Sequence, residues 1–294
     1  MIGELAALGC AVTWAVSSIM LKRPVVEMGA VGANLVRTWV AAAVFWAIIL
    51  ATGKLGQISH LSAYTVFALV MSMILGLGIG DTLYFRSLQL IGVSRALPIS
   101  GSYPLPTLLL AAVLLGEPVT LPQVAGTLLI VASVCLLSLG GWQPNEGLGQ
   151  KRDARLGAIL AIVAALLWAG STILLKSGVE QTEVPVANSL RLPAAGLVLV
   201  VMGLRQAGGI RIREVRRSTL GVVVLSGVIG TALGSALYLT SVIYAGAAKA
   251  AALQSVSPFF AAPLAFIFLK ERPSRATLIG TLLSVAGVWL LVGV

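Results

Sequence analysis

Residues 76–84 read GLGIGDTLY, and residues 230–238 read GTALGSALY. Four pairs of identical residues align between these stretches at a separation of 154 positions: Gly76 and Gly230, Gly80 and Gly234, Leu83 and Leu237, and Tyr84 and Tyr238. The same separation aligns further residues that are rare in an apolar chain, namely Trp14 and Trp168, Lys22 and Lys176, Asn34 and Asn188, Arg37 and Arg191, Pro104 and Pro258, Glu117 and Glu271, and Gly126 and Gly280. A repeat of this length indicates a duplicated structural half rather than a short solenoid unit.

The composition indicates a membrane protein. Of the 294 residues, 58% are hydrophobic and 10% are charged, and the mean hydropathy is +1.01. Soluble proteins average about 45–50% apolar and about 25% charged residues, and a soluble chain of this size could not bury every helix on all sides. The net charge of +10 could favour nucleic acid, but the basic residues lie in short loops between apolar runs, so no nucleic-acid partner is expected.

Ten apolar runs are long enough to cross a bilayer as helices, which takes about 20 residues each. They predict an all-α membrane protein with ten transmembrane helices in two five-helix repeats. The predicted spans lie near 3–21, 30–50, 63–87, 94–115, 121–140, 156–175, 185–204, 218–243, 248–269 and 275–293. The first repeat covers residues 1–140, a polar linker covers 141–155, and the second repeat covers 156–294. A membrane β-barrel is excluded because alternating segments of about ten residues are absent.

The loop charges predict that the second repeat is inverted relative to the first. Five spans per repeat reverse the direction in which the second repeat enters the membrane. Fourteen basic residues follow odd-numbered spans: Lys22, Arg23, Arg95, Lys151, Arg152, Arg155, Arg205, Arg211, Arg213, Arg216, Arg217, Lys270, Arg272 and Arg275. Three lie in the other loops: Lys54, Lys176 and Lys249. Because basic loops stay cytoplasmic, both termini are expected on the non-cytoplasmic side of the cell membrane, inner or plasma.

Each half carries a set of motifs in the same order. The first half contains Trp14-Ala15-Val16-Ser17-Ser18, the pair Asn34 and Arg37, Leu115-Gly116-Glu117-Pro118 and Gln123-Val124-Ala125-Gly126. The second half contains Trp168-Ala169-Gly170-Ser171-Thr172, the pair Asn188 and Arg191, Leu269-Lys270-Glu271-Arg272 and Thr277-Leu278-Ile279-Gly280. With ten spans in two inverted halves, the chain resembles the EamA branch of the drug/metabolite transporter superfamily over essentially its whole length.

The resemblance implies a transporter of small solutes, since members of that branch export amino acids, metabolites and other small compounds. We therefore expect a secondary transporter that exports small polar or amphipathic metabolites by alternating access between the two halves. A flippase of lipids or lipid-linked headgroups with the same fold is the alternative, because basic residues near the cavity would suit a lipid phosphate. The expected partners are a small-molecule metabolite and the lipid bilayer, and the expected assembly is a monomer or a homodimer.

Enzyme chemistry, cofactors and metals are not expected. The single histidine, His60, lies in a loop, and the chain has neither an HExxH motif nor a Walker A motif. Cys10 and Cys135 stand alone in apolar stretches, so they predict neither a disulfide nor a metal site.

Polar and aromatic residues within the spans are candidates for lining a solute cavity between the halves, formed by spans 1, 3 and 4 and their counterparts 6, 8 and 9. The candidates are Trp14, Ser17, Ser18, Asn34, Arg37, Tyr84, Ser100, Tyr103, Trp168, Ser171, Thr172, Asn188, Arg191, Tyr238, Gln254 and Ser257. Trp14 and Trp168 lie well inside their spans, which favours a cavity over the interfacial belt where tryptophan is common.

The two Asn–Arg pairs have two interpretations. Asn34 and Arg37 share a helix face, as do Asn188 and Arg191. An arginine near the bilayer centre costs roughly 2.5–3.5 kcal/mol on insertion scales. Each arginine either ties its helix to neighbouring carbonyl groups or places a cation beside the cavity, where it would attract carboxylates or phosphates.

Asp81 is the only acidic residue deep within a predicted span, and its equivalent in the second half is Ser235. The duplicated scaffold therefore does not require an acid at this position. An intramembrane acid is a functional candidate, here for carrying a proton or binding an amine. The alternative is a fixed ion pair with Arg86 or Arg37.

Proline and glycine mark possible moving parts. Pro104 and Pro258 lie within the fourth spans and are hinge candidates, because a proline frees the carbonyl four residues before it. The paired glycines of residues 76–80 and 230–234 predict close helix contacts, as a sliding seam between the halves or as static packing.

Overall fold

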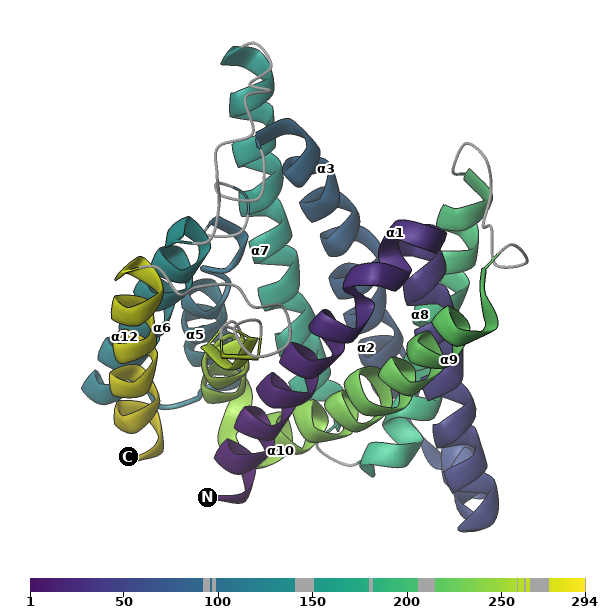
Figure 1. Ribbon diagram of the computed structural model, residues 1–294. Helices are drawn as coiled ribbons and strands as arrows, with labels where there is room; N and C mark the ends of the chain where they lie inside the picture. The colour runs from purple at the N-terminus through teal and green to yellow at the C-terminus, as the bar shows by residue number, and fades with distance from the viewer. Residues whose placement is uncertain are drawn as a thin grey trace.

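The computed structural model describes residues 1–91, 96, 99–140, 151–179, 182–205, 215–257, 259–261, 263–264 and 275–293. Within these ranges every regular element is a helix (Figure 1), which confirms the predicted all-α class. In the part of the chain that the structure describes, six helical stretches are long and apolar enough to cross a membrane: Ile2–Leu21, Val31–Ala51, Ala63–Tyr84, Arg155–Val179, Val184–Arg205 and Arg217–Gln254. Shorter apolar helices cover Pro104–Leu115, Leu121–Leu136 and Leu278–Val292.

The first two predicted spans correspond to Ile2–Leu21 and Val31–Ala51, two parts of the helical stretch α1 (Ile2–Ala51) that are separated by a kink. The helix continues through Pro24 and is interrupted only at Gly29, where φ is 76° and ψ is 159°. Glycine adopts such a positive φ without the penalty that a Cβ atom imposes. The two helices therefore meet at a kink at Gly29, where the sequence predicted a loop.

A second glycine kink separates the eighth and ninth predicted spans. The helix α10 (Gly234–Gln254) is interrupted at Gly246, where φ is 83° and ψ is 167°. The ninth span begins just after this kink, and residues 258, 262 and 265–269 of its predicted length lie outside the described residues.

The third span of each half contains a π-helical turn at equivalent positions. In the first half, α2 (Ala63–Met73) leads into the π-helix η2 (Ile74–Gly80) and then α3 (Asp81–Ile91). In the second half, α9 (Arg217–Ser226) leads into η4 (Gly227–Leu233) and then α10. Because π-turns widen a helix and occur frequently at functional sites, their duplication draws attention to these two segments.

The remaining elements are η1 (Lys54–His60), α5 (Pro104–Leu115), α6 (Leu121–Gly140), α7 (Lys151–Val179), α8 (Val184–Arg205) and α12 (Arg275–Val292). Pro104 begins α5 after a turn and does not kink a continuous helix. The carbonyl of Ser100 accepts a hydrogen bond from the Tyr103 N–H at 3.1 Å, so the predicted free carbonyl has a partner. The other hinge candidate, Pro258, lies outside the described residues.

The two halves interlock through their glycines. A Cβ atom at Gly76 would lie 2.7 Å from Ser171 Oγ on α7, and one at Gly234 would lie 2.8 Å from Trp14 Nε1 on α1. The third span of each half therefore packs against the first span of the other half. Such close approach requires residues without side chains, as is common between membrane helices.

The fifth spans, α6 and α12, pack against each other at one side of the molecule (Figure 1). The Ser133 hydroxyl on α6 donates to the Gly280 carbonyl on α12 at 2.7 Å. Large apolar side chains such as Leu109, Leu282 and Trp289 are exposed on the outer faces of α5 and α12, as expected of surfaces that contact lipid.

Carboxylates connect the halves at the helix ends. Glu117 follows α5 and accepts hydrogen bonds from the N–H groups of Ala247 at 2.6 Å and Ala248 at 3.1 Å, where α10 resumes after its kink. Glu183 precedes α8 and accepts hydrogen bonds from Lys54 and Gln57 of η1, which hold the pKa of its carboxyl group below the usual value.

Candidate functional site

A cavity of about 380 Å³ lies between the halves, and both contribute to its wall. The first half supplies Trp14, Met73, Gly76, Leu77, Asp81, Gly101, Tyr103 and Val134. The second half supplies Trp168, Ser171, Thr172, Arg191, Ser235, Tyr238, Gln254, Ser255 and Ser257. The volume falls within the range of roughly 300–1,000 Å³ that is typical of small-molecule pockets.

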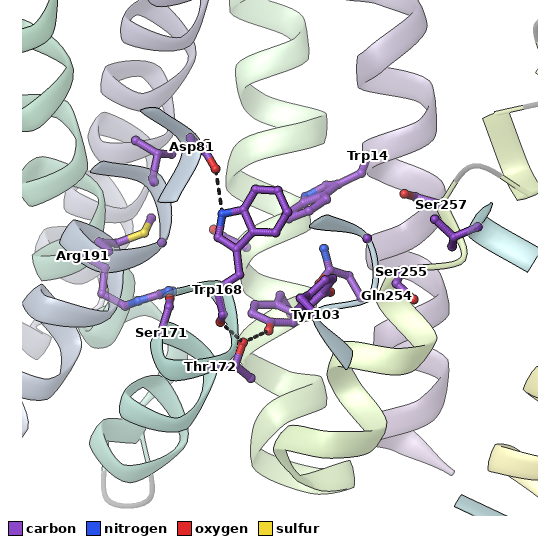
Figure 2. A pocket seen from close by; sticks show the side chains of 17 residues that line it. Trp14, Asp81, Tyr103, Trp168, Ser171, Thr172, Arg191, Gln254, Ser255 and Ser257 are labelled. Atoms are coloured by element: carbon purple, nitrogen blue, oxygen red, sulfur yellow. Dashed lines mark hydrogen bonds between the residues drawn. The ribbon is translucent and has the colours of Figure 1, made fainter. Parts of the chain in front are cut away.

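Trp168 forms the centre of one wall. Its indole N–H donates to Asp81 Oδ1 at 2.9 Å, and Figure 2 shows the ring between Asp81 and Tyr103. The ring centroids of Trp168 and Tyr103 lie 5.9 Å apart in an edge-on arrangement, and Tyr84 packs on Trp168 at 5.3 Å. Gly80 permits this position, because a Cβ atom there would lie 2.9 Å from the indole nitrogen.

Hydroxyl and amide groups supply further polar surface. The Tyr103 hydroxyl lies 2.9 Å from Gln254 Oε1 and 3.0 Å from the Ala251 carbonyl, and it can donate to either. The Thr172 and Tyr238 hydroxyls lie 2.9 Å apart. The Tyr103 contacts join the fourth spans of the two halves, and the contact between Thr172 and Tyr238 joins the first and third spans of the second half.

Two side chains of opposite charge line the cavity, Asp81 and Arg191. Arg191 is 4% exposed. Its Nε donates to Ser72 Oγ at 3.2 Å and its Nη1 donates to Asn188 Oδ1 at 3.3 Å. These bonds fix the guanidinium at the wall. A guanidinium so placed can bind a carboxylate or a phosphate, and a carboxylate such as Asp81 can accept from an amine.

The ion pair considered for Asp81 does not form. Among the described side chains, Asp81 accepts the Trp168 hydrogen bond and makes no ion pair with Arg37 or Arg86. The acid therefore faces the cavity without a fixed cationic partner among those residues.

Many of the residues proposed from the sequence meet at this cavity. They are Trp14, Asp81, Tyr103, Trp168, Ser171, Thr172, Arg191, Tyr238, Gln254 and Ser257. Their participation in solute binding stays a prediction.

Other candidates lie away from the cavity wall: Ser17, Ser18, Asn34, Arg37, Tyr84, Ser100 and Asn188. Ser18 and Ser100 donate to carbonyl groups four residues earlier in their own helices, at 2.8 and 2.9 Å. Asn188 holds Arg191, and Asn34 holds Arg37 through Nη1 at 3.2 Å.

The cavity also contains residues that the sequence did not single out as lining: Met73, Gly76, Leu77, Gly101, Val134, Ser235 and Ser255. Ser235 could have been found as the repeat equivalent of Asp81, and Ser255 as the neighbour of Gln254. Met73, Leu77 and Val134 could not be predicted, because the sequence does not distinguish an apolar residue that lines a cavity from one that faces lipid.

Comparisons with known proteins agree with this architecture. The EamA-like transporter family matches the chain twice, over residues 1–139 and 155–293. An uncharacterized transporter of Archaeoglobus fulgidus is 29% identical over 291 residues, which cover 99% of this chain and 98% of that protein. The uncharacterized inner membrane transporter YicL of Salmonella typhimurium is 39% identical over 86 residues, which cover 29% of each protein.

A solved crystal structure of a protein with 20% sequence identity superposes with a TM-score of 0.82, covering 98% of this chain and 94% of that one, and so has the same fold. The family match extends over nearly the whole sequence in two copies. The protein is therefore a membrane transporter, and the chain belongs to the EamA-like transporter family.

Proposed function

We propose that the protein is a secondary transporter that exports small zwitterionic or amphipathic metabolites, with amino acids as the substrate class. The observation that carries the proposal is the presence of Asp81 and Arg191 in one cavity. An amino acid carries one ammonium group, which can pair with Asp81, and one carboxylate group, which can pair with Arg191. The indole of Trp168 and the ring of Tyr103 offer apolar surface to the rest of the solute.

The two inverted halves are the proposed moving units. The solute binds between them, and rocking of one half against the other opens the cavity to each side of the membrane in turn. The reciprocal packing of η2 against α7 and of η4 against α1 supports this proposal, because each half contributes an equivalent surface to the interface.

A lipid headgroup flippase is the second candidate. The buried guanidinium of Arg191 beside apolar walls also suits a lipid phosphate. The acid Asp81 in the same cavity disfavours a phosphate with no amine, so a flippase of this kind would prefer zwitterionic headgroups.

A thermal-shift screen of the purified protein tests the proposed substrate class. A ligand that binds only the folded state raises the free energy of unfolding, by about 2.7 kcal/mol when its concentration is one hundred times its Kd. The melting temperature rises as a result. We expect amino acids to raise the melting temperature, and their amides or decarboxylated amines to do so less. Stabilisation by lipid phosphates alone would replace the exporter with the flippase. Stabilisation by sugars or nucleosides in preference to amino acids would contradict both.

We further propose that the protein lies in the cell membrane with both termini on the non-cytoplasmic side, on the basis of the uneven loop charges. His60 follows the second span, and Arg216 precedes the eighth; both are exposed. In a background without native cysteines, His60→Cys should react with an impermeant thiol reagent in intact cells, and Arg216→Cys should react only after the cells are opened. The reverse pattern would invert the orientation.

A further inference from the structure

Two equivalent groups of polar side chains lie at the interface between the halves. We call Ser72, Ser171 and Arg191 the Ser72 cluster. Their equivalents 154 positions away are Ser226, Ser17 and Arg37, which we call the Ser226 cluster. In each cluster a serine of one half's third span faces a serine and an arginine of the other half.

In the Ser72 cluster, hydrogen bonds cross between the two halves. Ser171 Oγ donates to the Ser72 carbonyl at 2.6 Å, and Arg191 Nε donates to Ser72 Oγ at 3.2 Å. These two bonds connect α2 of the first half to α7 and α8 of the second. Arg191 and Ser171 lie at the same edge of the cavity in Figure 2.

The same bonds are absent from the Ser226 cluster. Ser17 Oγ and Arg37 Nε are buried and have no hydrogen-bond partner among the described residues. Both lie against Gly230: a Cβ atom there would lie 3.1 Å from Arg37 Nη2, and Ser17 is in direct contact. A buried polar group without a partner is costly, so this arrangement needs an explanation.

The parts of the clusters that lie within one helix do not differ. The Ser72 and Ser226 hydroxyls donate to the equivalent carbonyls of Leu69 at 2.6 Å and Val223 at 3.0 Å. Each arginine also keeps its bond to the asparagine three residues earlier. The difference between the clusters is therefore confined to the bonds that cross between the halves.

We propose that the two clusters are alternative locks of the transport cycle. The Ser72 cluster stabilises the conformation seen here. In the conformation that opens to the other side of the membrane, Ser17 donates to the Ser226 carbonyl and Arg37 Nε donates to Ser226 Oγ, while the Ser72 bonds open. This inference rests on the proposed alternating access of the two halves.

The inverted repeat supplies the physical reason for the exchange. The two clusters have the same residues at the same spacing, so their local energies are alike, and only the relative position of the halves decides which one forms. Moving the halves exchanges one set of bonds for the other at little net cost. A low net cost is what a transporter needs to populate both conformations.

Replacing the two acceptor serines in turn tests the proposal. The probe is Ser235→Cys in the cavity, in a chain that also carries Cys10→Ala and Cys135→Ala, labelled with an impermeant thiol reagent in right-side-out and inside-out vesicles. Ser72→Ala should shift the ratio of the two labelling rates by about tenfold in one direction, the effect of losing one charge-assisted hydrogen bond. Ser226→Ala should shift it by a similar factor in the opposite direction, and the double variant should return it close to the starting value.

Ser241→Ala is the matched control. Ser241 is buried, and its hydroxyl donates to the Tyr238 carbonyl within its own helix at 2.7 Å, outside both clusters. It should leave the labelling ratio unchanged. If a serine variant does not fold, Ser171→Ala and Ser17→Ala test the same two locks.

Shifts in the same direction, a shift in only one of the paired variants, or no shift in either would overturn the exchange of locks. The labelling assay uses no solute. A failure of the proposed amino-acid specificity in the thermal-shift screen therefore leaves this result interpretable.

Discussion

Asp81→Asn is expected to abolish the stimulation of solute transport by an imposed pH gradient, while transport down the solute's own gradient continues. Asp81 lines the cavity and has no fixed cationic partner among the described residues. An asparagine keeps the size of the side chain and can still accept the Trp168 hydrogen bond, but it cannot gain or lose a proton. Proteoliposomes loaded with solute and diluted into buffers of different pH would measure the effect.

Glu183→Gln provides the control for Asp81→Asn. Glu183 is an acid outside the cavity, bound to Lys54 and Gln57 at the surface, so its replacement should preserve stimulation by the pH gradient. Stimulation of Asp81→Asn at the level of the unmodified protein would exclude this carboxylate as the proton carrier. The surviving mechanisms would then be facilitated diffusion or coupling through another group.

Arg191→Lys is expected to weaken solute binding by about tenfold to a hundredfold, because hydrogen bonds to charged groups contribute roughly 1.5–3 kcal/mol. Arg191 is held at the cavity wall through two of its nitrogens, and the proposed function has it bind the carboxylate of the solute there. A lysine presents a point charge and cannot reproduce both the bond to Ser72 and a planar contact with solute. Isothermal titration with the best solute from the thermal-shift screen would measure the Kd.

The equivalent substitution Arg37→Lys separates binding from folding. Arg37 bonds to Asn34 but does not line the cavity, so Arg37→Lys should change the Kd much less than Arg191→Lys. Equal Kd values for the two variants would remove Arg191 from the solute site. Equal loss of folded protein would show instead that both arginines serve the packing of their helices.

The sequence predicted the all-α fold because the repeat is long and its spans are strongly apolar. It did not predict that the first two spans meet at a kink at Gly29, because Pro24 and the neighbouring charges are typical of a loop. It also did not predict the π-helical turns η2 and η4. The glycines of these segments predicted close packing. Whether the segment becomes an α-helix or a π-helix depends on the partner helix, which lies in the other half.

The polar part of the cavity could be predicted, since a polar side chain within lipid needs a partner or a cavity. Trp168, Asp81 and Arg191 were found on this basis. Arg37 had the same sequence signal as Arg191 and yet lies off the cavity. Inverted repeats place identical local sequences in different surroundings, so the sequence alone could not distinguish the two arginines.

The hydrogen bonds of Glu117 have a consequence for how the protein is made. The N–H groups that donate hydrogen bonds to this carboxylate belong to residues that are synthesised 130 and 131 positions later. At about 5–20 residues per second, the ribosome delivers them roughly 10 s after Glu117 itself. During this interval the nascent first half has a carboxylate at a helix end whose partners do not yet exist. The final structure therefore forms only when the ninth span has been inserted, and a chain that stops before residue 247 leaves its first half incomplete.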